Sequence, residues 1–251
     1  TDALDELGLA EDTIFIYTSD HGSSMGSQGY LGKQNPYDES IRVPCFVRCP
    51  GRVPAGRRTD VPIGTIDLYP TLCGLAGFEA PPFCGGRDLS ELLLGGDSPA
   101  PEGQLITLPF SAGHYFASRQ RDPAEPVSHQ GPVDFPYRGV RTARNTYVVD
   151  SHGEALMSDK REDAYKMANR VADAAYDGVR SDLHGLLLDL LAEAEDPFIP
   201  DEWRSLELPD RIARQNEYYT LNAGPVSRQR AGFIEEKTTA IRNAPEWAGI
   251  D

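Results

Sequence analysis

The first twenty residues change from a helix-like to a strand-like pattern of apolar positions. The segment from Leu4 to Gly8 is typical of the last turns of a helix, with Gly8 as its end. An unbroken apolar run, with β-branched and aromatic members, then occupies Ile14–Tyr17. Such a run predicts a strand buried on both faces, as in a parallel sheet covered by helices. A helix, a loop and a buried strand together indicate an α/β domain.

A second strand and a second helix are expected before residue 104. The strand is predicted over Val43–Cys49, and a connector rich in turn-forming residues follows it. The helix is expected to begin near Leu68, with Thr65 or Asp67 as its cap. Asp67 could also be a catalytic acid, but we favour the capping role, because Asp commonly accepts the first free amides of a helix.

The second half of the chain changes to alternating strands and then to one amphipathic helix. After a linker at 95–103 we expect an antiparallel meander, with segments from Leu105 and over Tyr137–Thr142, Tyr147–Asp150 and Glu154–Met157. The region Asp159–Glu195 has a helical pattern whose apolar stripe should pack on the meander. The stripe consists of Val179, Leu183, Leu186, Leu187, Leu190 and Leu191. We therefore divide the chain into an α/β part (1–104), an antiparallel-sheet and helix subdomain (105–200) and a polar tail (201–251).

Composition limits the classes of partner. The formal net charge of the 251 residues is −15, which argues against nucleic acid, because neutralising phosphates requires a basic surface. Hydrophobic residues make up 39% of the chain and form no stretch as long as a membrane span. We expect neither a nucleic-acid nor a membrane partner, and the sequence leaves the oligomeric state open.

The candidate chemistry follows the first strand. Asp20 and His21 come at its carboxyl end, where open α/β sheets bind their ligands. A carboxylate oxygen and an imidazole nitrogen suit a divalent cation, and Lys33 can neutralise an oxygen of a sulfate or phosphate group. Taken alone, an Asp-His-Gly tripeptide more often caps a turn, with its His merely solvated. The longer pattern around it decides between these interpretations.

That longer pattern resembles the second signature of the sulfatases, which belong to the alkaline phosphatase-like superfamily. It consists of Thr13-Ile14, Ser19-Asp20-His21-Gly22, Gly26, Gly32-Lys33 and Tyr37-Asp38 followed by Arg42-Val43-Pro44. The resemblance extends from Thr1 to about Pro200 and is poor beyond. It implies that the α/β part is a partial parallel-sheet domain of the alkaline phosphatase-like type.

The resemblance also implies roles for the three candidate residues. In the family, the residues that match Asp20 and His21 are ligands of a divalent cation, usually calcium, with manganese or magnesium as alternatives. The residue that matches Lys33 contacts the sulfate. The implied substrate is a sulfated small molecule or carbohydrate, and the implied location is periplasmic or secreted. His114 is a weaker candidate for the substrate pocket, because an ordinary loop histidine is the commoner case.

The family nucleophile has no counterpart here. It is a formylglycine made within a Cys/Ser-x-Pro-x-Arg motif, and none of the four cysteines stands in such a motif. The paired aspartates that complete the family's metal site are also missing. The chain is therefore expected to be the C-terminal portion of a sulfatase, without the nucleophile.

Two other functions stay open. A phosphodiesterase or phosphonate monoester hydrolase of the same superfamily would share the Asp-His strand end. A truncated, non-catalytic binding module would keep the fold without the chemistry.

The missing nucleophile generates the first prediction. The isolated 251-residue chain should release no sulfate from an aryl sulfate, because it carries only part of the electrostatic machinery. A colorimetric arylsulfatase assay with the purified chain tests this, with a complete sulfatase as positive control. Turnover above the buffer blank would contradict it.

Overall fold

The structure is a computed structural model that describes residues 1–108, 137–150 and 153–196. Apart from residues 81–84, these belong to one compact unit. His114 and the polar tail predicted at 201–251 lie outside the described residues, and the division at residues 104 and 200 stays a prediction. In the parts described, no helix is both long enough and apolar enough to cross a lipid bilayer.

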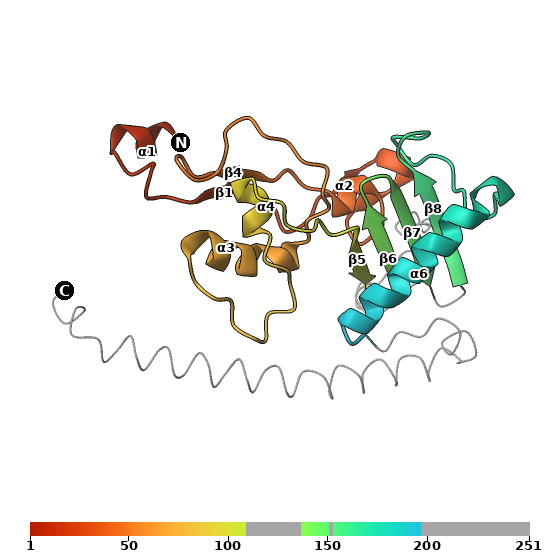
Figure 1. Cartoon of the computed structure of the whole chain (residues 1–251). Helices are drawn as coiled ribbons and strands as arrows, with labels where there is room; N and C mark the ends of the chain where they lie inside the picture. The colour runs from red at the N-terminus through yellow and green to blue at the C-terminus, as the bar shows by residue number, and fades with distance from the viewer. Residues whose placement is uncertain (109–136, 151–152, 197–251) are drawn as a thin grey trace, which may run out of the picture. The chain divides into compact units, whose positions relative to one another are not determined.

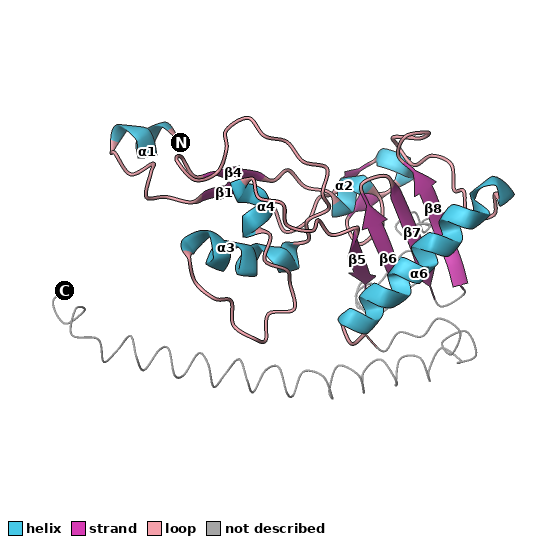
Figure 2. Cartoon of the chain, viewed as in Figure 1, coloured by secondary structure: helices cyan, strands magenta, loops and turns pink. Residues whose placement is uncertain are grey.

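Figures 1 and 2 show the order of the elements along the chain. The helices are α1 (Asp2–Glu6), α2 (Asp38–Ile41), α3 (Leu68–Ala76), α4 (Ser90–Leu94) and α6 (Asp177–Glu193), with 3-10 turns η1 (Ser27–Gly29), η2 (Thr65–Asp67) and η3 (Ala174–Tyr176). The strands are β1 (Phe15–Tyr17), β2 (Ser24–Met25), β3 (Leu31–Gly32), β4 (Phe46–Arg48), β5 (Gly103–Leu108), β6 (Tyr137–Thr142), β7 (Asn145–Asp150) and β8 (Gly153–Asp159).

The best-packed part of the molecule is an antiparallel sheet in the order β5-β6-β7-β8, with α6 lying across one face (Figure 1). Because side chains alternate between the faces of a strand, Tyr147 and Val149 of β7 point toward α6, and Val148 points to the other face. Leu183 and Leu187 of α6 meet the first face. The meander and the packing of the apolar stripe are confirmed, except that Val179 is 41% exposed.

The long helix is shorter than its sequence pattern suggested. It begins at Asp177 rather than near Asp159. Carboxylate or amide oxygens of Asp159, Asp163 and Asn169 accept backbone amide hydrogens two residues ahead, at 2.9 to 3.2 Å. Such local bonds compete with the helical i→i−4 bonds, so they fold the segment before α6 into successive turns.

The strand before the candidate residues differs from the expected one. β1 pairs with β4 in antiparallel register, and every strand pair among the described residues is antiparallel, so the predicted parallel sheet is not confirmed. The expected burial on both faces is wrong here, because the side chains of Phe15 and Ile16 are only partly buried and that of Tyr17 is exposed. Tyr17 is 57% exposed, and its ring centroid lies 6.2 Å from that of Phe46 on β4. The α/β content and the antiparallel sheet are confirmed.

Asp67 has a structural role, as the sequence favoured, but its carboxylate makes contacts other than the expected helix cap. Its carboxylate accepts the backbone amides of Gly64 at 2.8 Å and of Arg87 at 2.9 Å, and also the side-chain amide of Gln104. Since Asp67 is only 2% exposed, these bonds compensate for burying its charge. It fastens the start of α3 to a neighbouring loop and to β5, and a catalytic role is not supported.

The core under α6 generates a stability prediction. Leu187 is fully buried, whereas Leu188 beside it is 45% exposed. Leu187→Ala should lower the free energy of unfolding by about 2–5 kcal/mol, because it removes buried methyl groups and leaves a cavity. Leu188→Ala should change it by about 0.5 kcal/mol or less. Urea unfolding followed by circular dichroism measures both, and equal losses would show that α6 does not pack as described.

Candidate functional site

A short hairpin brings the three candidate residues together. β2 and β3 pair so that Ser24 lies opposite Gly32, and this returns the chain to the end of β1. Lys33, which follows Gly32, then reaches His21, and its Nζ lies 2.5 Å from the imidazole Nε2. Asp20 Oδ2 lies 3.2 Å from the same nitrogen. A carboxylate, an imidazole and an ammonium group therefore meet at one point.

Local bonds keep the Asp20 carboxylate charged. Oδ1 of Asp20 accepts the backbone amide of His21 at 2.9 Å, and the Ser19 hydroxyl lies 3.3 Å from the same oxygen. Burial opposes the charged form, but the amide of His21, its imidazole and the Ser19 hydroxyl together hold the pKa of Asp20 below its ordinary value. The side chain is 81% exposed. An ionised, accessible oxygen donor is the result.

The orientation of His21 assigns different tasks to its two ring nitrogens. Nδ1 lies 2.8 Å from the carbonyl oxygen of Gly22, and because a carbonyl can only accept, Nδ1 carries the proton. Nε2, on the other side of the ring, faces Oδ2 of Asp20 and Nζ of Lys33. A backbone carbonyl that fixes the tautomer in this way is usual for a histidine that binds a metal through its other nitrogen.

Gly22 allows the Asp20–His21 turn to lie against α2. Its backbone amide donates to the carbonyl oxygen of Ser40 at 2.8 Å. A Cβ at this position would overlap the carbonyl oxygen of Glu39. Only glycine permits this approach of two backbones, so the position of α2 determines the position of the candidate site.

The candidate residues open on a wide cleft. Asp20, His21 and Lys33 are among the residues that line a cavity of about 1500 Å³. Although the chain as a whole is strongly acidic, the cleft lining is mostly basic in its charged residues: Lys33, Arg42, Arg48, Arg57, Arg58, Arg141 and Lys160, against Asp20 and Asp60. Arg42 and Arg141 are paired with Asp38, and Arg48 is paired with Asp5. The positive charge that can attract an anionic ligand therefore comes mainly from Lys33, Arg57, Arg58 and Lys160.

Asp20 and His21 fit a divalent cation in kind but not in number. Oxygen and imidazole nitrogen are suitable donors. Among residues 1–108, 137–150 and 153–196, however, no group of three or more His, Cys, Asp or Glu side chains is placed to hold a metal ion. A hard cation held tightly needs more ligands than these two.

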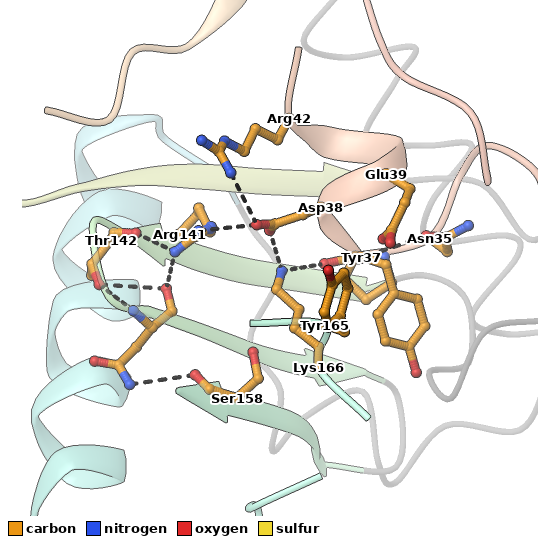
Figure 3. Close-up of polar contacts among 12 residues, drawn as sticks. Asn35, Tyr37, Asp38, Glu39, Arg42, Arg141, Thr142, Ser158, Tyr165 and Lys166 are labelled. Carbon is orange, nitrogen blue, oxygen red and sulfur yellow. Dashed lines mark hydrogen bonds and ion pairs between the residues drawn. The ribbon is translucent and has the colours of Figure 1, made fainter. Parts of the chain in front are cut away.

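A cluster of charges surrounds the largely buried Asp38, and the sequence patterns assigned it no role (Figure 3). Asp38 of α2 faces Lys166 at 2.5 Å, Arg141 of β6 at 3.3 Å and Arg42 at 4.0 Å. Burial opposes ionisation of Asp38, but the cations around it, Lys166 first, hold its pKa below the ordinary value. Arg141 and Asp38 form a largely buried pair, with side chains 14% and 17% exposed.

Two signals in the sequence could have pointed to this cluster. The Asp and Asn residues between Asp159 and Asp173 are spaced as in successive turns, which argues against the predicted helix. A lysine inside such a compact loop can turn inward. What no pattern shows is the partner of Lys166, since Asp38 precedes it by 128 positions in the chain.

Comparison with known proteins gives one family. The model of the sulfatase family matches residues 1–78. An ulvan-active sulfatase from Formosa agariphila is 32% identical over 200 residues, which cover 78% of this chain and 36% of the relative. The chain thus spans about a third of the length of the curated relatives that resemble most of it.

Two solved structures are also similar to this chain. An enzyme in complex with its substrate D-glucosamine-2-N,6-O-disulfate has a TM-score of 0.64 at 25% identity, covering 79% of this chain and 38% of its own. The phosphonate monoester hydrolase of Agrobacterium radiobacter has a TM-score of 0.60 at 29% identity, covering 76% and 37%.

The contact of Gly22 with α2 generates a prediction. Gly22→Ala should destabilise the chain by about 1–3 kcal/mol, because the new methyl group must push two backbones apart. Gly178→Ala is the matched control, since a Cβ there meets nothing within 4 Å. Thermal unfolding compares the two variants. If Gly22→Ala were as stable as Gly178→Ala, the approach of α2 to the site would be disproved.

Proposed function

The chain belongs to the sulfatase family, and we propose that it carries part of the active site of a sulfuric ester hydrolase. The observation that supports this most directly is the meeting of Asp20, His21 and Lys33 at the edge of a cleft whose charged lining residues are mostly basic. Since the chain spans 36% of the ulvan-active relative, the activity of the whole protein is part of the proposal.

Asp20 and His21 are proposed to hold a divalent cation, with calcium favoured over manganese or magnesium. The cation, when bound, supplies positive charge beside the oxygens of the ester. Asp20 contributes an ionised carboxylate, and His21 contributes the unprotonated Nε2. Further ligands must join these two.

Lys33 is proposed to contact an oxygen of the sulfate. Its ammonium group already lies beside the two proposed ligands, so it can neutralise negative charge that develops on the ester next to them. The basic lining of the cleft supports an anionic substrate. A sulfated carbohydrate is favoured, because one relative is described as ulvan-active and another was solved with a disulfated glucosamine.

The nucleophile is proposed to be a formylglycine, by resemblance to the family, although no residue of this chain lies in the motif that forms it. A periplasmic or secreted location and the substrate-binding role of His114, which lies outside the described residues, likewise remain proposals. A truncated module without catalysis stays the non-enzymatic alternative.

The rival activity is hydrolysis of phosphonate monoesters, which the likeness to the Agrobacterium radiobacter enzyme favours. The donors Asp20 and His21 suit either reaction. The two activities are separated by assaying the protein as its gene encodes it on an aryl sulfate and on a phenyl phosphonate, and comparing kcat/KM for each.

The same assay tests the metal assignment. Asp20→Ala should lower kcat/KM for the sulfate ester by at least about 100-fold, because loss of a direct ligand should exceed the 10–100-fold cost of losing an outer partner. Asp12→Ala is the control, because Asp12 is an exposed aspartate on the loop before β1. Retained activity in Asp20→Ala would refute the assignment.

A further inference from the structure

The loop that carries Lys33, residues 28–38, is held at both of its ends by two neighbouring residues of the distant segment after β8. At one end, the side-chain amide of Gln28 donates to the backbone oxygen of Tyr165 at 2.8 Å. At the other end, Nζ of Lys166 donates to the backbone oxygen of Pro36 at 3.2 Å and pairs with Asp38 at 2.5 Å. Lys33 lies between these two attachments.

Lys166 is placed to hold the loop rather than to meet solvent. Its side chain is 2% exposed, and Figure 3 shows it directed at Asp38 from the side opposite Arg42. Burial lowers the pKa of Lys166 to about 8, against the opposing effect of Asp38. At pH 7 the ammonium group therefore keeps its charge and all of its donors.

The backbone conformation also indicates that Lys166 holds the Lys33 loop in place. Four non-glycine residues in the described chain have positive φ, and three of them are Gln28, Gln34 and Lys166. Residues with side chains adopt this conformation at a cost, and they keep it only where the surroundings determine it. The strained positions thus gather in the Lys33 loop and at the residue that holds it.

The contact between Lys166 and Asp38 also supports Asp20 and His21, because α2 connects it to the turn that carries them. Asp38 opens α2, and Ser40 of the same helix accepts the amide of Gly22, directly after His21. Asn35 in the Lys33 loop donates to the hydroxyl of Ser24 at 3.1 Å, in the hairpin between the two halves of the site. Lys33 and the Asp20–His21 turn therefore share one support.

We propose that Lys166 is a positioning residue, which holds the Lys33 loop and α2 so that the Lys33 ammonium group lies beside Asp20 and His21. This inference rests on the proposed function only in taking Lys33 as the group that contacts the ester. Lys166 touches no reacting group itself, and Tyr165 assists it by accepting from Gln28.

Hydrogen–deuterium exchange at pH 7 on the 251-residue chain tests the support directly. Lys166→Met removes the charge and keeps the length of the side chain. Amides of residues 28–40 should then exchange about 10-fold faster or more, while those of β6, β7 and α6 stay protected, because local opening needs only the lost contacts. Lys160→Met is the control, since it makes the same change six residues earlier, and in the described chain the Lys160 side chain has no hydrogen bond or ion pair with residues 28–38.

A second variant keeps the test decisive if Lys166→Met fails to fold. Gln28→Asn tolerates the same positive φ but is one methylene too short to reach Tyr165. It should raise exchange around residues 28–33 and leave the sheet unchanged. Unaltered exchange of residues 28–40 in a folded Lys166→Met variant, or in Gln28→Asn if the first does not fold, would overturn the proposal.

Kinetics of the protein as its gene encodes it separate positioning of Lys33 from general stability. Lys166→Met should lower kcat/KM for the sulfate ester about 10- to 100-fold, because small displacements of a reacting contact are costly. In a Lys33→Met background the same change should have almost no further effect, since both act through one group. Full additivity of the two losses would refute a role through Lys33.

Failure of the proposed function can be told apart from failure of the positioning role of Lys166. If the wild-type protein hydrolyses no sulfate ester, the proposed function fails, and the exchange experiment alone decides whether Lys166 supports the loop. If the wild type is active and exchange of residues 28–40 is unchanged by the variants, the proposed function stands and the positioning role of Lys166 is wrong.

Discussion

The arrangement of the candidate site depends on one largely buried carboxylate, that of Asp38. Its pairs with Lys166 and Arg141 join segments more than a hundred positions apart in the chain. A charge taken out of water is costly unless it is paired and hydrogen-bonded, so Asp38 must be met by these cations. The requirement fixes where α2 lies, and α2 in turn supports the turn that carries Asp20 and His21.

The site combines this rigid support with exposed functional groups. Asp20 is 81% exposed at its side chain, whereas Lys166 behind it is 2% exposed. The division is physically reasonable, because groups that exchange ligands must be reached by solvent, while the groups that orient them are held best in a dry, packed environment. The antiparallel sheet and α6 contribute at a distance, by presenting Arg141 and by anchoring the turns that end in Lys166.

Sequence patterns were reliable where one short segment contained the whole signal. The alternation in β6, β7 and β8, the stripe on α6 and the motif that indicated the family all depend on near neighbours. Predictions were wrong where a local pattern fits two outcomes. The apolar run Ile14–Tyr17 does not by itself show what covers the strand, and the polar segment after Asp159 suits a helix until its Asp and Asn side chains bond to nearby amides.

The sequence by itself therefore determined the family and the elements of the antiparallel subdomain, and it singled out Asp20, His21 and Lys33 as candidates for the chemistry. The tertiary structure decided what holds those residues in place. Three contacts join positions far apart in the chain. Asp38 pairs with Lys166, the backbone of Gly22 lies close to that of Glu39, and β1 pairs with β4 in antiparallel register. The reason is that periodicity and motifs report a residue's neighbours along the chain, whereas burial of charge and close packing depend on which distant groups meet it in space.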